Sequence, residues 1–376
     1  MPHALWIALA ADDVRQWVGR WNLRRDHAPR GNHVLPRKPG EPGVGRPVMV
    51  SAAPSVVFHD QRSKRTLVKG PNRERDVANQ GEGPAPDGIA PDPSQASRLL
   101  RQFGVRPSKR LGQSFLIDAS ALEKVINAAS LNREDTVLEV GAGLGALTRR
   151  LAREVRRVIS VEYDRRLVPI LRRVLEDCPQ VTLLQGDIMH LDLDAVLAGG
   201  SYRVVANIPY NLTSALFRRL LVSSNPPERV VFMVQKEVGE RVVSLPGEMS
   251  LLALSVQIYG CPSIRAQIPA RAFYPQPKVD SVILRVDVHS KLRVEPELVG
   301  LVFALAKAGF GQRRKTLRNS LASGFRMRPE RIRKWLDEAE LPGMVRAQEL
   351  GLDDWARLAT IVHQAGVMAG EGTEQL

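Results

Sequence analysis

Cysteine is scarce in this chain of 376 residues, which contains only Cys178 and Cys261. Neither belongs to a Cys-x-x-Cys pair or a Cys/His cluster, so the sequence predicts no disulfide framework and no metal site. Long apolar runs are also absent, since no stretch reaches the length of a membrane-spanning helix. The first 11 residues lack a basic segment and are followed by Asp12 and Asp13, which argues against a signal peptide. These absences predict a reduced, cytoplasmic protein with no membrane partner.

Acidic residues are outnumbered by basic ones, and the imbalance indicates the kind of partner. The chain has 54 Lys and Arg against 40 Asp and Glu, which gives a net charge of +14. The excess gathers in residues 313–334, where nine basic side chains accompany a single acid, Glu330. A charge of this size favours a polyanion, either nucleic acid or an acidic membrane face.

The composition divides the chain into four parts. Residues 1–95 are rich in Pro, Gly, Arg and Asn with little hydrophobic periodicity, so we expect a disordered extension there. This extension is either a basic tail that touches RNA or a dispensable segment, and we favour the second interpretation. Residues 96–290 and 291–366 carry the patterns of two ordered domains, and 367–376 is expected to be a disordered tail.

Short apolar strands alternate with helical segments in the larger domain. Strands are predicted at 136–140, 157–161, 181–185, 202–206 and 229–234, with two more at 263–268 and 279–286. Helices are predicted at 94–103, 119–129, 165–175 and 213–221. A further helix is predicted to follow the glycine loop and to end at 152. The alternation indicates an α/β fold with a doubly wound parallel sheet, and the helical period of 295–363 indicates a small all-helical C-terminal domain.

Polar residues stand where the predicted strands end, which is the edge at which such sheets bind ligands. Gly141 and Gly143 lie in a Gly-x-Gly-x-Gly loop, where backbone amides can approach a ligand closely. Glu162 follows the second strand and can bind ribose hydroxyls, and Asp187 follows the third and can accept from an adenine amino group. NAD is the competing cofactor. The glycine spacing, Asp187 and the corner after the fourth strand favour S-adenosylmethionine.

The fourth strand ends in the sequence Asn-Ile-Pro-Tyr at residues 207–210. The amide oxygen of Asn207 and a nearby backbone carbonyl can both accept from an exocyclic amine and turn its lone pair toward an electrophile. Tyr210 offers a flat face on which a base can stack. By itself the corner also fits an ordinary strand-to-helix turn, in which Thr213 or Ser214 caps the following helix.

Three other segments have both a functional and a structural interpretation. Lys109 and Arg110 precede a glycine turn. This segment is either a lid over a cofactor, in which Lys109 and Arg110 contact phosphates, or an ordinary segment that leads into the next helix. Phe273 lies in a proline-stiffened loop and either faces a base in the pocket or belongs to the core. Arg314 and Arg318 are predicted to share one helical face by their i,i+4 spacing, and this face either contacts phosphates or is simply solvated.

Taken together, these motifs resemble the KsgA/RsmA family of small-subunit rRNA adenine-N6 dimethyltransferases. The resemblance runs from about residue 99 to 362. It rests on Lys-Arg-Leu-Gly-Gln-Ser-Phe-Leu at 109–116, Glu-Val-Gly-Ala-Gly at 139–143, Glu162, Gly-Asp at 186–187, Asn-Ile-Pro-Tyr at 207–210, Gln-Lys-Glu at 235–237, Phe-x-Pro-x-Pro-Lys-Val-Asp-Ser at 273–281 and Gln-Arg-Arg-Lys-Thr-Leu-Arg-Asn-Ser-Leu at 312–321.

The resemblance implies a Rossmann-like methyltransferase domain followed by a small helical domain. It implies S-adenosylmethionine contacts at Ser114, Leu116, Gly141, Glu162, Asp187 and Asn207. The family usually has Asn at the position of Ser114, so we expect a weaker contact there. The implied substrate is two adjacent adenosines in the loop of the 3′-terminal hairpin of 16S rRNA, within a 30S or pre-30S particle.

The implied mechanism is direct methyl transfer to adenine N6, with no metal and no covalent enzyme intermediate. Asn207 and the carbonyl of Pro209 are expected to orient the amine, and Tyr210 and Phe273 to hold the flipped base. The predicted RNA contacts are Lys109, Arg110, Lys278, Arg313, Arg314, Lys315 and Arg318. We expect a monomer.

Three rival interpretations remain open at this point. An Erm-type 23S rRNA adenine methyltransferase shares the fold and the Asn-x-Pro-Tyr corner, although the segments at 273–281 and 312–321 favour the KsgA side. A second interpretation, a relative that acts as a mitochondrial transcription factor, has little support in the sequence. A ribosome-assembly factor that acts mainly by binding belongs to another class, and the intact site argues against it.

Overall fold

The structure is a computed structural model that describes residues 93–209 and 212–366. The described chain forms two compact units. The N-terminal unit contains residues 93–244 and 252–291, and the C-terminal unit contains 245–251 and 292–366. Most of the predicted extension at 1–95, the predicted tail at 367–376 and Tyr210 lie outside the described residues.

A seven-stranded sheet forms the centre of the N-terminal unit, with the strand order β4-β3-β2-β5-β6-β9-β7. Strands β2 to β6 are parallel to one another, β9 pairs with β6 in antiparallel register, and β7 pairs with β9 in the same way. The strands are β2 (Thr136–Val140), β3 (Arg157–Glu162), β4 (Val181–Gln185), β5 (Arg203–Asn207), β6 (Arg229–Gln235), β7 (Gly260–Ile268) and β9 (Ser281–Val288). The order reverses between β2 and β5, and ligands bind in doubly wound sheets at such a switch point.

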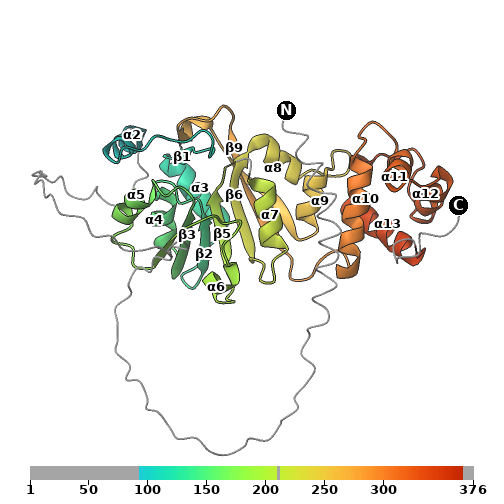
Figure 1. Cartoon of the computed structure of the whole chain (residues 1–376), viewed down its shortest axis with the longest axis horizontal. Helices are drawn as coiled ribbons and strands as arrows, with labels where there is room; N and C mark the ends of the chain where they lie inside the picture. The colour runs from blue at the N-terminus through green and yellow to red at the C-terminus, as the bar shows by residue number, and fades with distance from the viewer. Residues whose placement is uncertain (1–92, 210–211, 367–376) are drawn as a thin grey trace, which may run out of the picture. The chain divides into compact units, whose positions relative to one another are not determined.

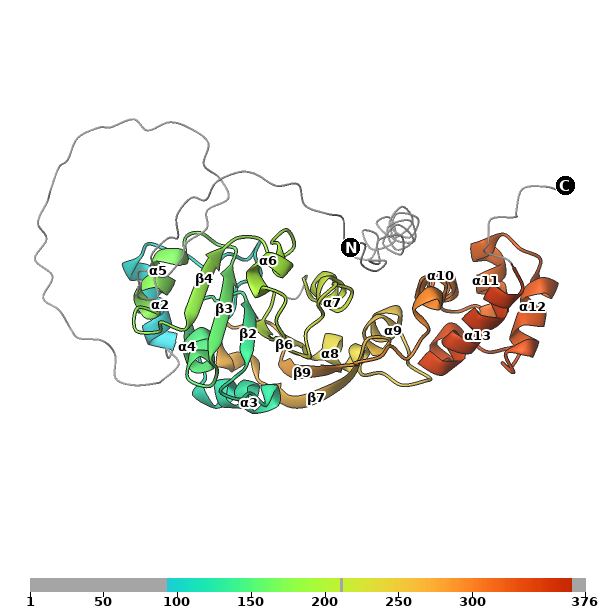
Figure 2. The ribbon, with the colours of Figure 1, turned by 90° about the horizontal axis from the view of Figure 1, so that it is seen from below.

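Helices cover both faces of this sheet (Figures 1 and 2). Val137, Val158 and Val205 belong to one apolar core with residues of α3, α4 and α5. On the opposite face, Phe217 of α7 packs on Phe232 of β6 with ring centroids 4.9 Å apart. The helices of this unit are α2 (Pro93–Gln102), α3 (Ala119–Ala129), α4 (Ala146–Ala152), α5 (Val168–Val174), α6 (Leu193–Leu197), α7 (Thr213–Leu221), α8 (Lys236–Val242) and α9 (Leu251–Gln257). Burial on both faces explains why the central strands are continuous apolar runs.

Helix α3 shows how the local sequence sets the ends of an element. Asp118 caps its N-terminus, where the carboxylate accepts a hydrogen bond of 2.7 Å from the N–H of Ala121. The helix ends at Ser130, which adopts the left-handed conformation at φ 48°. Between these ends, the apolar positions face the core. The predicted bounds at 119–129 are therefore confirmed.

A second, two-stranded sheet joins segments that are far apart in the sequence. Strand β1 (Phe115–Leu116) pairs in antiparallel register with β8 (Phe273–Tyr274). The N–H of Ile117 then donates to the carbonyl of Ala272 at 2.9 Å. The glycine turn before α3 and the proline-containing loop after β7 are thereby fixed to each other.

The C-terminal unit is helical and packs around Trp355, which is fully buried. Its elements are η2 (Pro296–Leu298), α10 (Val299–Phe310), α11 (Leu317–Phe325), α12 (Pro329–Glu338), η3 (Ala347–Glu349) and α13 (Leu352–Gln364). Gly309 lets α10 approach closely, because a Cβ there would stand 2.8 Å from the ring of Trp355. Phe310 completes the contact at a ring centroid distance of 5.7 Å from Trp355.

Two local predictions are wrong. Residues 311–315 form a turn and α11 begins only at Leu317, so Arg314 and Arg318 do not share a helical face. The cause is Thr316, which adopts an extended conformation as the N-cap of α11 and starts a new helix there. Likewise, neither Thr213 nor Ser214 caps α7, because Leu212 occupies the N-cap position without a side-chain hydrogen bond.

Candidate functional site

The carboxyl ends of β4, β3, β2 and β5 bring four of the predicted site segments to one edge of the sheet. Because these strands are neighbours in that order, Asp187, Glu162, Gly141 and Asn207 follow one another along the edge. The same edge lies at the switch point between β2 and β5. Parallel strands place their end-of-strand side chains together in this way, and the site therefore follows from the topology.

The glycine loop after β2 has a backbone that few other residues could adopt. Gly141 and Gly143 have φ of +82° and +60°, which is the left-handed region. The N–H of Gly141 donates to the carbonyl of Val161 at 2.8 Å. A Cβ at Gly141 would stand 3.5 Å from the backbone oxygen of Asn207. A side chain at this position would therefore enter the space between the loop and the end of β5.

Glu162 is buried and receives two backbone hydrogen bonds. Its Oε2 accepts from the N–H of Gly143 at 2.9 Å, and its Oε1 accepts from the N–H of Asp164 at 2.7 Å. Burial raises the pKa of Glu162, and the two N–H donors oppose that rise because they favour the charged form. Each oxygen retains a further lone pair, so this carboxylate can still accept from ligand hydroxyl groups.

Glu139 is a second carboxyl below the glycine loop, and it is completely buried. Its Oε2 accepts from the hydroxyls of Thr148 and Ser160, each at 2.6 Å. Its Oε1 has no hydrogen-bond partner among the described residues. Burial raises the pKa of Glu139 to about 7, and the charge of Glu162 contributes in the same direction. Glu139 therefore connects α4 to β3 and β2 inside the protein rather than facing a ligand.

Asp187, by contrast, is open to a ligand. Its Oδ1 accepts from the N–H of Met189 at 2.9 Å, and its Oδ2 lies 3.1 Å from Nδ1 of His190. The side chain of Asp187 is 38% exposed. An exposed acceptor at the end of β4 suits an amino group of a nucleoside.

The amide of Asn207 is oriented by the segment that precedes α3. Its Nδ2 donates to the backbone carbonyl of Ser114 at 2.9 Å. Because the NH2 group faces this carbonyl, the amide oxygen of Asn207 points elsewhere and remains an acceptor. The carbonyl of Pro209 accepts from the N–H of Leu212 at 2.9 Å and keeps one lone pair. Ser114 thus contacts Asn207 through its main chain, whichever side chain it carries.

Two other predicted site residues, Leu116 and Phe273, lie in the apolar core. Phe273 is 3% exposed and Leu116 is 5% exposed, and they are paired across β1 and β8. The core interpretation of Phe273 is the one that this arrangement favours, since a stacking ring needs an open face. Tyr210 lies outside the described residues.

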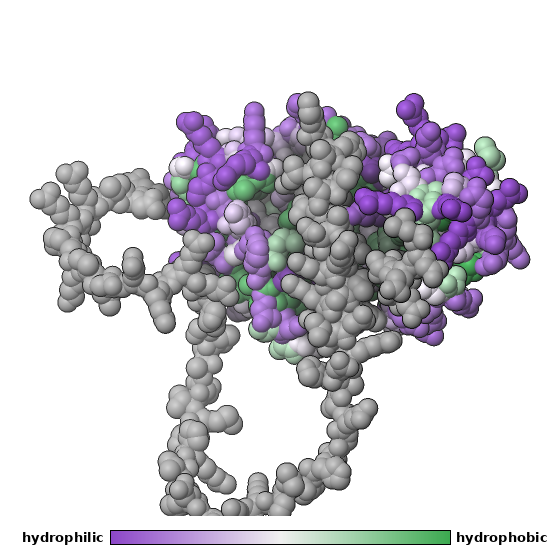
Figure 3. All heavy atoms as spheres, turned by 45° about the vertical axis from the view of Figure 1, so that its right-hand side comes forward, coloured by the Kyte–Doolittle hydropathy of each residue, from purple (hydrophilic) through white to green (hydrophobic). Residues whose placement is uncertain are grey.

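All of the predicted RNA-binding cations except Arg318 are exposed. Lys109, Arg110 and Lys278 are exposed on the N-terminal unit. On the C-terminal unit, the turn between α10 and α11 carries exposed side chains at 313–315, and Arg318 is half-buried at the start of α11. Much of the visible surface of this unit is hydrophilic (Figure 3). Exposed cations on backbone held by packed helices are suited to phosphate contacts.

Sequence reasoning missed Gln113 and Asp164. Nε2 of Gln113 donates to Oδ2 of Asp164 at 2.9 Å, and Arg166 binds the same carboxylate at 2.7 Å. Hydrogen bonds from Arg166 hold the pKa of Asp164 below its usual value. Asp164 lies two residues after Glu162, but a contact across 51 residues leaves no signal in the spacing.

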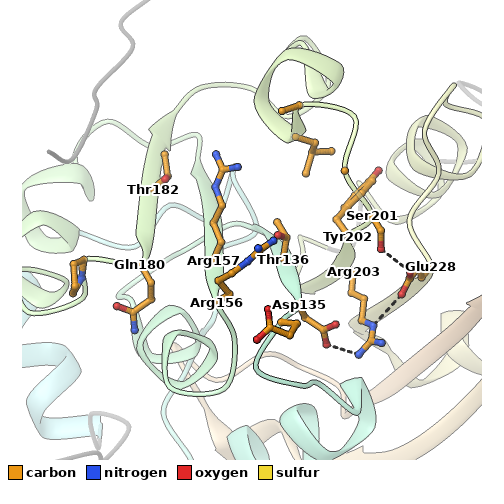
Figure 4. A pocket seen from close by; sticks show the side chains of 15 residues that line it. Asp135, Thr136, Arg156, Arg157, Gln180, Thr182, Ser201, Tyr202, Arg203 and Glu228 are labelled. Atoms are coloured by element: carbon orange, nitrogen blue, oxygen red, sulfur yellow. Dashed lines mark hydrogen bonds and ion pairs between the residues drawn. The ribbon is translucent and has the colours of Figure 1, made fainter. Parts of the chain in front are cut away.

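A separate hollow of about 680 Å³ opens at the amino ends of the strands, the edge opposite the candidate site (Figure 4). Arg203 lies in it and pairs with Asp135 at 2.5 Å and Glu228 at 3.5 Å. The charged side chains that line the hollow are three arginines and three carboxylates. Their charges balance, so the hollow does not favour a polyanion.

Solved structures with the same architecture define the class of protein. A dimethyladenosine transferase from Plasmodium falciparum superposes with a TM-score of 0.58 at 23% identity, covering 67% of this chain and 98% of that one. The 23S rRNA methyltransferase ErmE superposes with a TM-score of 0.55 at 26% identity, covering 66% of this chain and 100% of that one. The first likeness concerns the fold alone. The N-terminal unit is accordingly a Rossmann-like methyltransferase fold, as the sequence predicted.

The family follows from the sequence comparisons. A family model described as ribosomal RNA adenine dimethylase matches residues 105–364. A ribosomal RNA small subunit methyltransferase A from Dehalococcoides mccartyi is 40% identical over 266 residues, which are 70% of this chain and 91% of that protein. A protein of the same name from Alkaliphilus metalliredigens is 36% identical over 71% of this chain and 95% of its own length. The chain belongs to the ribosomal RNA adenine dimethylase family, and the resemblance inferred from its motifs is confirmed.

Within the described parts of the chain, no helix is long and apolar enough to span a membrane. The same residues contain no cluster of three or more His, Cys, Asp or Glu side chains that could hold a metal ion.

Proposed function

We propose that this protein uses S-adenosylmethionine to dimethylate N6 of two adjacent adenosines in the 3′-terminal hairpin loop of 16S rRNA. The substrate would be a 30S or pre-30S particle in the cytoplasm. Membership of the adenine dimethylase family and the small-subunit name of the relatives support this proposal. The single observation that carries it is the hydrogen bond from Asn207 to Ser114, because it leaves the amide oxygen available for an amine.

The residues at the carboxyl edge fit the cofactor. The absence of a side chain at Gly141 keeps the space beside the end of β5 free, and Gly143 lets the loop lie close to the ring of Phe115. Glu162 would accept from ribose hydroxyls and Asp187 from the adenine amino group. Ser114 and Leu116 would line the pocket from β1 and the residue before it. When bound, S-adenosylmethionine supplies the methyl group on a sulfonium ion.

The chain itself contributes orientation and electrostatics. The amide oxygen of Asn207 and the carbonyl of Pro209 would accept from the two N–H bonds of the target amine. This holds the nitrogen lone pair out of conjugation with the ring and directs it toward the methyl group. The target base must leave its stack, and Tyr210 is the proposed stacking surface. A role for Phe273 would be to support the pocket from the core.

Phosphate contacts would supply most of the affinity for rRNA. Lys109, Arg110 and Lys278 are the proposed contacts on the N-terminal unit. Arg313, Arg314, Lys315 and Arg318 are those on the C-terminal unit. Since such contacts are independent of the reacting base, binding and transfer should respond to different substitutions.

A variant of Asn207 tests the proposal. Asn207→Ala should abolish methyl transfer to 30S particles in single-turnover assays and leave 30S binding within about twofold, because phosphates dominate RNA affinity. Asn225→Ala is a matched control, since the Nδ2 of Asn225 donates to the carbonyl of Gly200 near the opposite edge of the sheet. Near-normal transfer by Asn207→Ala would contradict the proposed mechanism.

The likeness to ErmE motivates a second candidate, a 23S rRNA adenine methyltransferase. Both candidates use the same corner at the end of β5, so active-site variants cannot separate them. Incubation with S-adenosylmethionine and purified 30S or 50S subunits separates them. Methyl transfer only to 50S subunits would favour the second candidate.

A further inference from the structure

The turn at residues 108–113 is closed by two reciprocal hydrogen bonds. The N–H of Ser108 donates to Oε1 of Gln113 at 2.7 Å, and the N–H of Gln113 donates to the carbonyl of Ser108 at 3.2 Å. Gly112 supports the turn with a φ of +63°. Lys109 and Arg110 are exposed between these ends. The turn is therefore a closed loop with Gln113 at its base.

Gln113 also fastens this turn to the end of β3. Its Nε2 donates to Oδ2 of Asp164 at 2.9 Å, and Asp164 is only 6% exposed. The direction of the amide is unambiguous, since its oxygen faces an N–H and its NH2 group faces a carboxylate. Asp164 is itself fixed by Arg166 at 2.7 Å and by its own N–H to Glu162 at 2.7 Å. Gln113 thus anchors the turn to a rigid, charged network.

The next residue reaches the end of β5. The carbonyl of Ser114 accepts from Nδ2 of Asn207 at 2.9 Å. Since β2 lies between β3 and β5, residues 113 and 114 pass across the end of β2. The ring of Phe115 confirms this path, because it lies 3.0 Å from where a Cβ on Gly143 would stand. One short segment therefore links the carboxylate network to the amide that would orient the target amine.

We propose that Gln113 is a positioning residue for methyl transfer: its hydrogen bond to Asp164 holds the Ser114 carbonyl where that carbonyl orients the amide of Asn207. The inference rests on the proposed function of Asn207. Without the anchor, the segment is free to shift, and a displacement of about 1 Å at a reacting geometry can cost on the order of a hundredfold in rate. The effect should fall on the transfer step rather than on affinity.

Two substitutions separate the two hydrogen bonds of Gln113. Gln113→Met keeps the length of the side chain and removes both bonds. Gln113→Glu keeps an acceptor for the N–H of Ser108 but turns a carboxylate toward Asp164 and removes the donor. Gln180→Met is the matched control, because Nε2 of Gln180 donates to the carbonyl of Ala152. Gln180 lines the hollow at the opposite edge of the sheet (Figure 4).

The measurement is single-turnover methyl transfer to 30S particles at saturating S-adenosylmethionine and saturating 30S. Both Gln113 variants should be slower than wild type by roughly tenfold or more, and Gln180→Met should match wild type. Melting temperatures close to wild type show that the variants are folded. Rates within twofold of wild type at saturation would overturn the proposal, and so would slower rates that are seen only when either substrate is below saturation.

The pH profile supplies a readout that general loosening of the fold would not produce. In Gln113→Glu, a proton shared between the new carboxyl and Asp164 restores a hydrogen bond at low pH. The ratio of the Gln113→Glu rate to the wild-type rate should therefore rise as the pH falls, although Arg166 on the same carboxylate opposes proton uptake. The Gln113→Met ratio should stay flat, and equal slopes for both variants would contradict the assignment.

A wild-type protein inactive on rRNA would refute the proposed function itself, whereas an active wild type with equally active variants would refute only the role of Gln113.

Discussion

Replacing Glu139 by Gln should change how the stability of the sheet depends on pH. Glu139 is fully buried beneath the glycine loop and accepts from two hydroxyls at a single oxygen. Burial raises its pKa from 4.5 to about 7. Gln is a neutral side chain of the same shape, so the variant represents the protonated acid at every pH. The difference between the two proteins then isolates the titration of one carboxyl.

The sign and size follow from linkage. A carboxyl whose pKa is raised by folding binds a proton more tightly in the folded chain, so folding is favoured as the pH falls from about 7 toward 4.5. At about 1.4 kcal/mol for each pH unit of pKa difference, the gain is on the order of 3 kcal/mol. Carboxylates with lowered pKa values, such as Asp164 and Asp177, have the opposite dependence, but they are common to both proteins. Relative to Glu139→Gln, wild type should therefore become more stable by about 2.5 kcal/mol between pH 8 and pH 5, and the rest of the gain lies below pH 5.

The assay must report on the sheet rather than on the whole chain. The described tryptophans, Trp335 and Trp355, belong to the C-terminal unit and do not report on β2. Native-state hydrogen exchange of the β2 and β3 peptides, followed by mass spectrometry, measures the relevant opening free energy. Glu123→Gln is a suitable control, because Glu123 lies on the surface and its pKa is lowered by Arg150. A wild-type to Glu139→Gln difference that is constant from pH 5 to pH 8 would refute the reasoning.

Three further predictions concern ligands. Glu162→Ala should weaken S-adenosylmethionine binding by about 1–3 kcal/mol, because two ribose hydrogen bonds are lost, and should leave 30S affinity unchanged. Calorimetry with the cofactor measures this, and an unchanged cofactor affinity would reject the assignment. The combined Arg314, Lys315 and Arg318→Ala variant should bind 30S weakly and lower the slope of log affinity against log salt by roughly one unit for each lost contact, as a filter-binding salt series can show. Deletion of residues 1–90 should leave methylation nearly intact, because the family match begins at residue 105; a larger loss than in the triple variant would identify the extension as an RNA-binding arm.

The sheet was predictable because its central strands are buried on both faces. Strands β2 and β4 have the predicted bounds, since short apolar runs between glycine and polar residues leave few alternatives. The segments of β7 and β9 were predicted as strands, but the pattern does not encode their antiparallel direction. The short helices α6 and α8 were not predicted, and for α6 the reason is that five residues carry little periodicity.

The candidate site was predictable as far as topology determines it. Glycines and acids at the ends of consecutive strands must meet at one edge, whatever the details of packing. Side-chain partners are different, because Gln113 meets Asp164 only through the course of the chain over 51 residues. The prediction that Arg314 and Arg318 share a helical face was wrong for a local reason. Thr316 lies between them and is the N-cap of α11, so the i,i+4 spacing does not apply across it.

The most direct test of the proposed function is to locate the transferred methyl groups. Unmethylated 30S particles are incubated with the protein and S-adenosylmethionine, and the 3′-terminal fragment of 16S rRNA is analysed by mass spectrometry. We expect two methyl groups on each of two adjacent adenosines of the hairpin loop, and none with the Asn207→Ala variant. An unmodified 3′ fragment, or methylation confined to adenosines elsewhere in rRNA, would contradict the proposed function.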